Sequence, residues 1–298
     1  MDRPSLAIIG SSHYKKSTVQ SLIEEGKAVF EKVTFAPINK VRVVFEKNEA
    51  KLLYKGKNLL DYDVCYPRLS SRDYVFGEAV IDVIDNSKAY SPVNLRSYQI
   101  TNHKYYTIKE LSNAKIPIVK SSLFIDPDAA RNILSEFGMP FVVKLLSGFA
   151  GKGVILIENT KQLNSILDTV SLFDEFISAQ KFVKGKNSDI RCFVIGENVI
   201  AVKRVGKQGE WRANVSRGGT AEEIVPSNEM KKIALDSAKL FKMDICAVDL
   251  MESDSGLAVI EINFMPGPFK KFLGNRVIKD IIQYLHSKAV EKDEVTEN

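Results

Sequence analysis

Apolar runs and amphipathic stretches alternate over the first ninety residues of the chain. A short apolar run at residues 6–10 is followed by a stretch with helical spacing at residues 18–32. Further strand patterns lie at residues 33–37 and 63–67, and a further helix pattern lies at residues 73–84. Strands that alternate with helices are typical of a parallel sheet covered by helices.

A hairpin interrupts this series before it ends. Residues 41–45 and 51–54 both have strand patterns, and they flank the polar stretch 46–50. The alternation stops near residues 91–94, Ser-Pro-Val-Asn, where we place the first boundary between structural units. We therefore expect residues 1–92 to form an N-terminal α/β domain.

The second predicted unit, residues 93–178, mixes helices and strands. Asp126 is a suitable N-cap and Gly138 a suitable C-terminal residue for a helix over residues 127–137. Other helices are expected over residues 104–114 and 161–170, and strands over residues 116–120, 141–146, 154–157 and 172–177.

The third predicted unit, residues 179–298, contains two hairpins. The first joins residues 191–195 to 199–205, and the second joins residues 245–252 to 257–263. A helix over residues 228–241 separates them, and a final amphipathic helix leads into a charged end, which we expect to be frayed.

Composition limits the class of protein. The 298 residues are 45% hydrophobic and 27% charged, as in a folded globular protein, and the apolar runs are far shorter than the roughly 20 residues that span a bilayer. No secretory signal pattern opens the chain, so we expect a cytoplasmic protein with no membrane association. Cys65, Cys192 and Cys246 lie in apolar strand patterns and are predicted to be buried free thiols.

The net charge of +5 gives little support to nucleic-acid binding. The 42 basic residues are interleaved with 37 acidic ones, and no block of basic side chains stands out. Attraction to small anionic molecules accounts for the charge equally well, so we expect no nucleic-acid partner.

The closing hairpin carries the strongest chemical signal. Asp249 and Glu261 each interrupt an apolar strand, and Asn263 lies two residues beyond Glu261 on the same face. Buried carboxylates are costly unless a positive group meets them, and three oxygen-bearing side chains on one surface suit Mg²⁺. A half-buried sheet with polar residues on its wet face would give the same pattern.

A glycine-rich stretch, residues 144–154, carries a second signal. Its glycines allow backbone amides to approach an anion, and Lys144 within an apolar strand calls for an anionic partner. The stretch joins two strands and lacks the spacing of a Walker loop, so a P-loop is excluded. An ordinary glycine-rich turn remains the alternative.

A third signal is the loop 212–219, which presents arginines and an amide beside glycines. Arginine forks bind phosphate or carboxylate through two hydrogen bonds, although a solvated loop has the same composition. His13, His103 and His286 form no pattern of nucleophile and base, which disfavours a Ser-His or Cys-His hydrolase. We interpret His103 as a structural residue.

Together these motifs resemble the ATP-grasp superfamily, and specifically its RimK-like branch of glutamate and amino-acid ligases. The resemblance covers nearly the whole chain, at Tyr66-Pro67-Arg68, the Lys104 region, residues 140–144 with the glycine loop, 174–177, 189–191, 211–219, 248–249 and 261–263. It implies an α/β protein in which two α+β subdomains grip ATP, preceded by a Rossmann-like pre-ATP-grasp domain. The subdomains would be residues 93–178, central and lid, and 179–298, metal-binding.

The resemblance also implies a role for each matched residue. Lys104, Lys144, Arg212 and Asn214 would contact the ATP phosphates under a lid formed by Gly148, Gly151, Lys152 and Gly153. Glu175 and Phe176 would line the adenine site, and Asp189 would lie near the ribose. Asp249, Glu261 and Asn263 would hold Mg²⁺, with Mn²⁺ as its substitute. Arg204 and Arg217 would serve catalysis by binding the acyl phosphate or a substrate carboxylate.

The implied activity is a carboxylate-amine ligase that forms an acyl phosphate from ATP and adds glutamate or another amino acid. The acceptor would be a small molecule, a coenzyme or a protein tail, and the family implies a homodimer or homotetramer. A glutathione-synthetase-like or dipeptide ligase and a non-catalytic ATP-binding regulatory protein are the alternatives. The sequence departs from the family at residues 264–271, after the metal strand, and at the basic stretch 178–186, which reads as an inserted connection.

Overall fold

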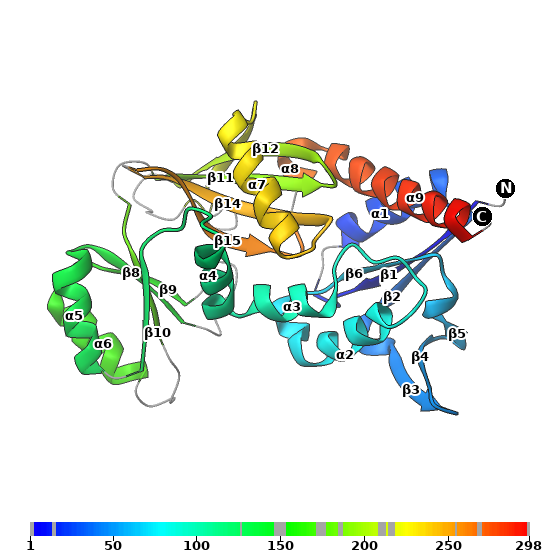
Figure 1. Ribbon diagram of the computed structural model, residues 1–298, viewed down its shortest axis with the longest axis horizontal. Coiled ribbons are helices and arrows are strands. Elements are labelled where there is room, and N and C mark those ends of the chain that lie inside the picture. The colour runs from blue at the N-terminus through cyan, green and yellow to red at the C-terminus, as the bar shows by residue number, and fades with distance from the viewer. Residues whose placement is uncertain are drawn as a thin grey trace.

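The computed structural model describes residues 3–13, 16–125, 127–145, 153–170, 177–183, 187–207, 213, 218–253, 255–266 and 270–296. Four sheets lie within these residues (Figure 1). No described helix is long and apolar enough to cross a membrane.

The first sheet is parallel and has strand order β2-β1-β6. Its strands are β1 (Ser5–Gly10), β2 (Lys32–Pro37) and β6 (Val64–Arg68). Because neighbouring side chains on a strand point to opposite faces, Ala7 and Ile9 pack with α2 (Tyr74–Asp85), while Leu6 and Ile8 pack with α1 (Lys16–Val29). The sheet is therefore covered on both faces, as the alternating sequence pattern predicts.

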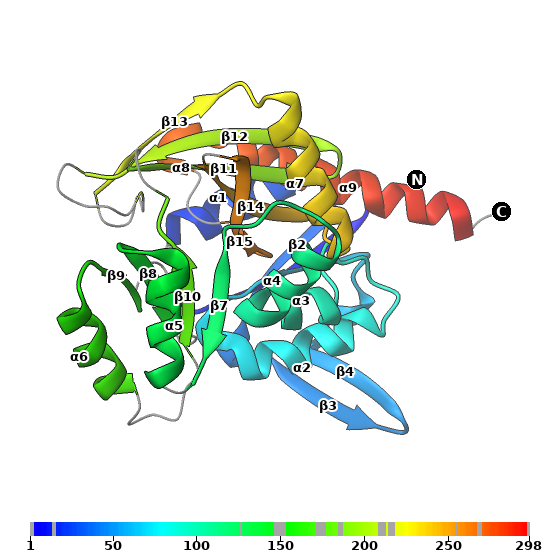
Figure 2. The same cartoon turned by 60° about the vertical axis from the view of Figure 1, so that its left-hand side comes forward.

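A separate antiparallel sheet projects beside the first one. It consists of β3 (Arg42–Glu46), β4 (Glu49–Tyr54) and β5 (Lys57–Asn58), and confirms the predicted hairpin (Figure 2). Two helices, α3 (Leu95–Asn102) and α4 (Lys104–Asn113), then lead toward the next sheet.

The next sheet has the order β7-β10-β8-β9 and a core of its own. Its strands are β7 (Ser121–Phe124), β8 (Phe141–Leu145), β9 (Val154–Ile157) and β10 (Ile177–Lys181). Helices α5 (Pro127–Phe137) and α6 (Thr160–Val170) pack against it through Phe137, Ile133, Leu163 and Leu167. This core includes no buried residue of the other sheets among those described.

The last sheet is antiparallel, with the order β13-β12-β11-β14-β15. Its strands are β11 (Ser188–Ile195), β12 (Asn198–Val205), β13 (Thr220–Ile224), β14 (Ile245–Ser253) and β15 (Gly256–Asn263). Helix α7 (Asn228–Leu240) covers one face, and α8 (Lys270–Leu273) leads into α9 (Arg276–Thr296) on the other.

The two faces of this sheet pack against different sets of apolar residues. Cys192 and Val248 belong to the face under α7, whereas Phe193 and Ala247 pack with α9 and with strands of the N-terminal sheet. Toward the other end, the α9 face is no longer apolar, because Asp189 and Arg191 occupy the next alternating positions of β11. The face that α9 leaves uncovered is the place where the charged residues gather.

Several sequence predictions differ from the structure. Residues 116–120 form no strand except for an isolated bridge from Ile118 to Val259, because Pro117 lacks an amide hydrogen and its carbonyl accepts from Val259 instead. The stretch 178–186, interpreted as an inserted connection, begins with β10, which pairs with β7 and β8. Helix α9 also continues into the end that was expected to be frayed.

The elements that were not predicted include α3 and β13. Helix α3 begins with a capping box, in which Asn94 Oδ1 accepts from the Ser97 amide at 2.9 Å and Ser97 Oγ accepts from the Asn94 amide at 3.1 Å. The three cysteines are buried and free, as predicted. The boundary after residue 92 stays a prediction, and so does the boundary after residue 178, which falls within β10.

Candidate active site

Charged side chains from neighbouring strands share one face of the last sheet. Asp189 and Arg191 are two residues apart on β11, and they lie directly opposite Arg204 on β12 and Asp249 on β14. Asp249 in turn lies opposite Glu261 on β15. The strand register therefore brings together residues that are up to 72 positions apart in the sequence.

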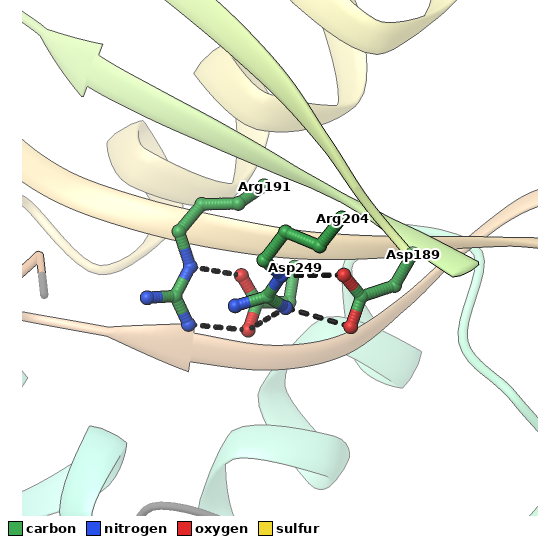
Figure 3. A network of polar contacts seen from close by, with 4 residues as sticks. All are labelled: Asp189, Arg191, Arg204 and Asp249. Atoms are coloured by element: carbon green, nitrogen blue, oxygen red, sulfur yellow. Dashed lines mark hydrogen bonds and ion pairs between the residues drawn. The ribbon is translucent and has the colours of Figure 1, made fainter. Parts of the chain in front are cut away.

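Asp189, Arg191, Arg204 and Asp249 form a connected ion network, which we call the quartet (Figure 3). Arg191 donates through Nε to Asp249 Oδ1 at 2.7 Å and through Nη2 to Oδ2 at 2.6 Å. Arg204 donates in the same way to Asp189, at 2.5 and 2.7 Å, and its Nη2 also lies 2.9 Å from Asp249 Oδ2. The quartet has no net formal charge.

Burial makes these pairs interdependent. Side-chain exposure is 3% for Asp249, 9% for Arg204, 11% for Asp189 and 16% for Arg191. Burial alone would raise the pKa of Asp249, but Arg191 and Arg204 lower it to about 2 through charge and hydrogen bonds. For Asp189, burial outweighs Arg204 and raises the pKa, so Asp249 is the more firmly ionised carboxylate.

The neighbouring strand β15 supplies two uncommitted groups. Glu261 is exposed, and the Asn263 side chain has a buried Nδ2 with no hydrogen-bond partner among the described residues. No hydrogen bond among the described residues therefore fixes the Nδ2 end of the Asn263 amide. Two carboxylates and one amide on adjacent strands fit Mg²⁺, which commonly completes its shell with water and substrate phosphates. No group of three His, Cys, Asp or Glu side chains within the described ranges could hold a metal alone.

Lysines from the preceding segments approach this face. Burial lowers the pKa of Lys144 on β8, Glu261 and Asp249 act in the opposite direction, and Lys104 lowers it further. Lys104 is the first residue of α4, where its charge opposes the positive end of the helix dipole. Lys104 at a helix N-terminus and Lys144 on β8, with two carboxylates near Lys144, form a suitable site for a phosphate that brings its own cation.

Other predicted site residues lie in different surroundings or outside the described ranges. Gly153 has a positive φ of 73° and directly precedes β9. Lys270, in the stretch 264–271 that departs from the family, donates to Ser21 Oγ at 2.6 Å and so links α8 to α1. The structure does not describe Gly148, Gly151, Lys152, Glu175, Phe176, Arg212, Asn214 or Arg217.

Arg191 belongs to the site although we did not single it out from the sequence. The available signal was its position, since Arg191 lies two residues after Asp189 and interrupts an otherwise apolar run up to Ile195. Two charges of opposite sign alternate on one face of β11, and that face becomes apolar further along the strand. Charges at such positions are favourable when the neighbouring strands place opposite charges beside them. Arg204 and Asp249 are those charges.

Comparisons with known proteins identify the family. Residues 101–285 match the model of the RimK-like ATP-grasp domain. A probable alpha-L-glutamate ligase of Vibrio vulnificus (strain YJ016) is 33% identical over 223 residues, which cover 74% of each chain. A probable alpha-L-glutamate ligase of Shewanella loihica is 29% identical and covers 95% of this chain and 96% of its own.

A solved structure shares the whole fold. It is the ATP-grasp ligase PsnB complexed with a minimal precursor, Mg and ADP, with a TM-score of 0.74 and 19% identity, over 96% of this chain and 98% of PsnB. The expected fold class is therefore confirmed: an ATP-grasp fold with an N-terminal parallel sheet. From its sequence relatives and its match over more than half its length, this chain belongs to the RimK-like ATP-grasp family of ATP-dependent carboxylate-amine ligases.

Proposed function

We propose that the protein adds L-glutamate to the carboxylate of an acceptor, with ATP as the energy source and Mg²⁺ as the metal. The observation that supports this most directly is that the charges of Glu261, Lys104 and Asp249 all act on the buried ammonium of Lys144 and shift its pKa. Anionic phosphates and a divalent cation would each find opposite charges there. The names of the sequence relatives support glutamate as the amino acid to test first.

The chain's cations would bind and orient the nucleotide. Lys144 lies on a strand of a packed sheet, and its ammonium is destabilised by burial, so a phosphate would relieve a cost that the fold already carries. The backbone amides at the N-terminus of α4 carry a partial positive charge, which would also attract an anion. Lys104 on α4 and Lys144 on β8 would thus hold the phosphates from two separate elements of the fold.

The carboxylates would hold the cation that accompanies ATP. Asp249, Glu261 and Asn263 are the residues that we assign to it, and Mn²⁺ would serve as a substitute. When bound, the metal neutralises charge on the phosphates during transfer. Asp249 is kept ionised by its arginines, and Glu261 is exposed, so neither carboxylate needs to lose a proton first.

The chemistry requires positioning more than a protein nucleophile. A carboxylate oxygen of the acceptor takes the γ-phosphoryl group from ATP, which leaves ADP and an acyl phosphate. The glutamate amine then attacks the acyl carbon, phosphate leaves, and the nitrogen loses a proton as the amide forms. Exclusion of water protects the acyl phosphate during this interval.

Arg204 enters this reaction in a way that the sequence did not suggest. Its guanidinium is held by Asp189 and Asp249, so a substrate carboxylate would have to compete with two buried protein carboxylates. We therefore assign to Arg204 a role in holding the site together. Arg217 remains our candidate for contact with the acyl phosphate or a substrate carboxylate, and Asp189 remains our candidate near the ribose.

An ADP-release assay with product mass spectrometry tests the proposal. Purified protein with ATP and Mg²⁺ would be given L-glutamate together with small carboxylates, carboxylated coenzymes or peptides with free C-termini. We expect ADP release to require both an acceptor and glutamate, and the product mass to increase by one glutamyl residue. Glutamate that never appears in any product, while another amino acid does, would contradict the assignment of the amino acid.

Matched lysine variants separate the site from the surface. Lys144→Ala is expected to weaken nucleotide binding, whereas Lys232→Ala is expected to leave it unchanged. Lys232 is an exposed lysine on α7 that pairs with Asp236 and is a suitable control for the loss of one charge. Equal nucleotide affinity in both variants would remove Lys144 from the site.

A further inference from the structure

Arg191 leaves the Asp249 carboxylate with one acceptor position that the described residues do not use. Oδ2 accepts from Arg191 Nη2 at 2.6 Å and forms an ion pair with Arg204 Nη2 at 2.9 Å, whereas Oδ1 accepts from Arg191 Nε at 2.7 Å. Each carboxylate oxygen has two lone pairs. Two guanidinium groups therefore lie against Oδ2, whereas Oδ1 has one lone pair that no described residue uses.

The orientation of this carboxylate is fixed by the backbone. Arg191 and Asp249 lie directly opposite each other on β11 and β14, and the two parallel hydrogen bonds between them hold carboxylate and guanidinium in one plane (Figure 3). The Asp249 side chain is 3% exposed, so it has little room to turn. A cation that used both of its oxygens would have to break a contact with arginine.

Arg204 constrains Asp249 less than Arg191 does. Its Nε and Nη2 are committed to Asp189, and Asp249 receives one shared contact from Nη2. Arg191 has Asp249 as its acid partner among the described residues and engages both oxygens. Arg191 is thus the residue whose loss would free the carboxylate to rotate.

The number of oxygens that a carboxylate offers matters to the choice of cation. Ca²⁺ accepts six to eight oxygens and takes carboxylates through one or two oxygens, at about 2.3–2.6 Å. Mg²⁺ demands an octahedral shell at about 2.0–2.1 Å, which a single oxygen of Asp249 suits better than a chelating pair. We propose that Arg191 is a specificity-determining positioning residue, which restricts Asp249 to cation ligation through Oδ1 and so favours Mg²⁺ over Ca²⁺. This inference rests on the proposed function, because it takes Asp249 as a metal ligand.

Cation competition measures this effect without any turnover. Mn²⁺ binding would be followed by electron paramagnetic resonance in the presence of β,γ-methylene ATP, and Mg²⁺ and Ca²⁺ would be titrated as competitors. Arg191→Lys keeps the charge but loses the fork that engages both oxygens. We expect the ratio of Ca²⁺ to Mg²⁺ affinity to rise by about tenfold, the lower end of the effects seen when a partner of a metal ligand is lost.

Arg276→Lys is the matched control. Arg276 donates to Glu223 at the surface, outside the quartet, so this variant makes the same chemical change without touching Asp249. The control is expected to keep the wild-type ratio. A ratio in Arg191→Lys that equals that of the wild type and of the control would overturn the inference.

Asp249→Asn distinguishes failure of the inference from failure of the proposed function. Wild-type Mn²⁺ affinity in this variant would remove Asp249 from the metal site, and with it both proposals. Lost affinity in Asp249→Asn together with an unchanged ratio in Arg191→Lys would overturn the selectivity role alone.

A structure of the wild-type protein with Mg²⁺ and the ATP analogue gives a test that needs no variant to fold. Ligation through Oδ1 with the Arg191 fork in place would support the inference. A cation held by both oxygens of Asp249 would overturn it.

Discussion

Arg204 lies directly opposite Asp189 on the neighbouring strand and donates to both of its carboxylate oxygens. The same guanidinium also contacts Asp249, so one arginine balances part of the charge of two buried carboxylates. Removal of Arg204 would leave Asp189 without its counter-charge and Asp249 with Arg191 alone. The quartet is therefore a structural requirement of the last sheet as well as part of the candidate site.

The first prediction concerns the stability of the quartet. Arg204→Met should lower the free energy of unfolding by about 3–5 kcal/mol, because it leaves a buried carboxylate unpaired. Urea denaturation followed by circular dichroism would measure the change. Lys232→Met, at an exposed ion pair on α7, should change it by no more than about 0.5 kcal/mol. A loss below about 1 kcal/mol in Arg204→Met would show that the quartet contributes little.

The second prediction separates metal binding from folding. Glu261→Gln should lower turnover supported by Mg²⁺ by at least about 100-fold, since it removes an anionic ligand of a hard cation. Because Glu261 is exposed, the melting temperature should hardly change. Asp249→Asn should lower both the turnover and the melting temperature, because Asp249 is buried between two arginines. Wild-type turnover of Glu261→Gln at low Mg²⁺ would contradict the metal assignment.

The third prediction links nucleotide binding to pH. Burial holds the pKa of Lys144 below the ordinary lysine value of about 10.4, and a phosphate beside it would raise that pKa again. Between the two pKa values, binding must take up a proton. Nucleotide affinity should therefore fall as the pH rises through the lower pKa.

Calorimetry in buffers of different ionisation enthalpy would measure this proton uptake at alkaline pH. Lys144→Met should abolish it, whereas Lys232→Met should keep it. The same uptake in wild type and Lys144→Met would mean that another group is responsible.

The fourth prediction concerns the cysteines. Burial raises the pKa of each thiol, Cys65, Cys192 and Cys246, to about 12, so almost none of the reactive thiolate is present at pH 8. The native protein should show no rapidly reacting thiol toward dithiobis-nitrobenzoate, and three should react after denaturation. A thiol that reacts within seconds in the native protein would contradict the burial of at least one of them.

The strand and helix order was largely predictable because most elements satisfy local rules. Residues 127–137 have the apolar spacing of a helix, and α5 covers the same residues. Helix α3 was not predicted because its pattern is weak, and its start depends on the bonds between Asn94 and Ser97. Residues 116–120 look like a strand, yet Ile118 pairs with Val259, a partner 141 positions away that no local pattern reveals.

The site was predictable as a set of residue types, but its pairing was not. Carboxylates at Asp249 and Glu261 stand out within apolar runs, but their pairing depends on a β-bulge between Asp249 and Leu250, which shifts the hairpin register so that Glu261 lies opposite Asp249. The partners of Asp249 come from β11 and β12, and the choice of neighbouring strand is a property of the whole sheet. Arg204 was therefore expected to face a substrate, whereas in the structure it is bound by Asp189 and Asp249.

Strand β1 and helix α9 share one apolar core, so the order of synthesis affects when that core can form. Leu6 and Ile8 of β1 pack with Val277 and Ile281 of α9, so the N-terminal sheet completes its apolar cover with a helix that is made about 270 residues later. At roughly 5–20 residues per second, translation leaves this surface open for on the order of ten seconds or more. We expect nascent chains stalled before α9 to be cut by protease throughout the first ninety residues, and protection at that stage would show that the sheet folds alone. Until then, the apolar face that Leu6 and Ile8 present would be open to association with other apolar surfaces.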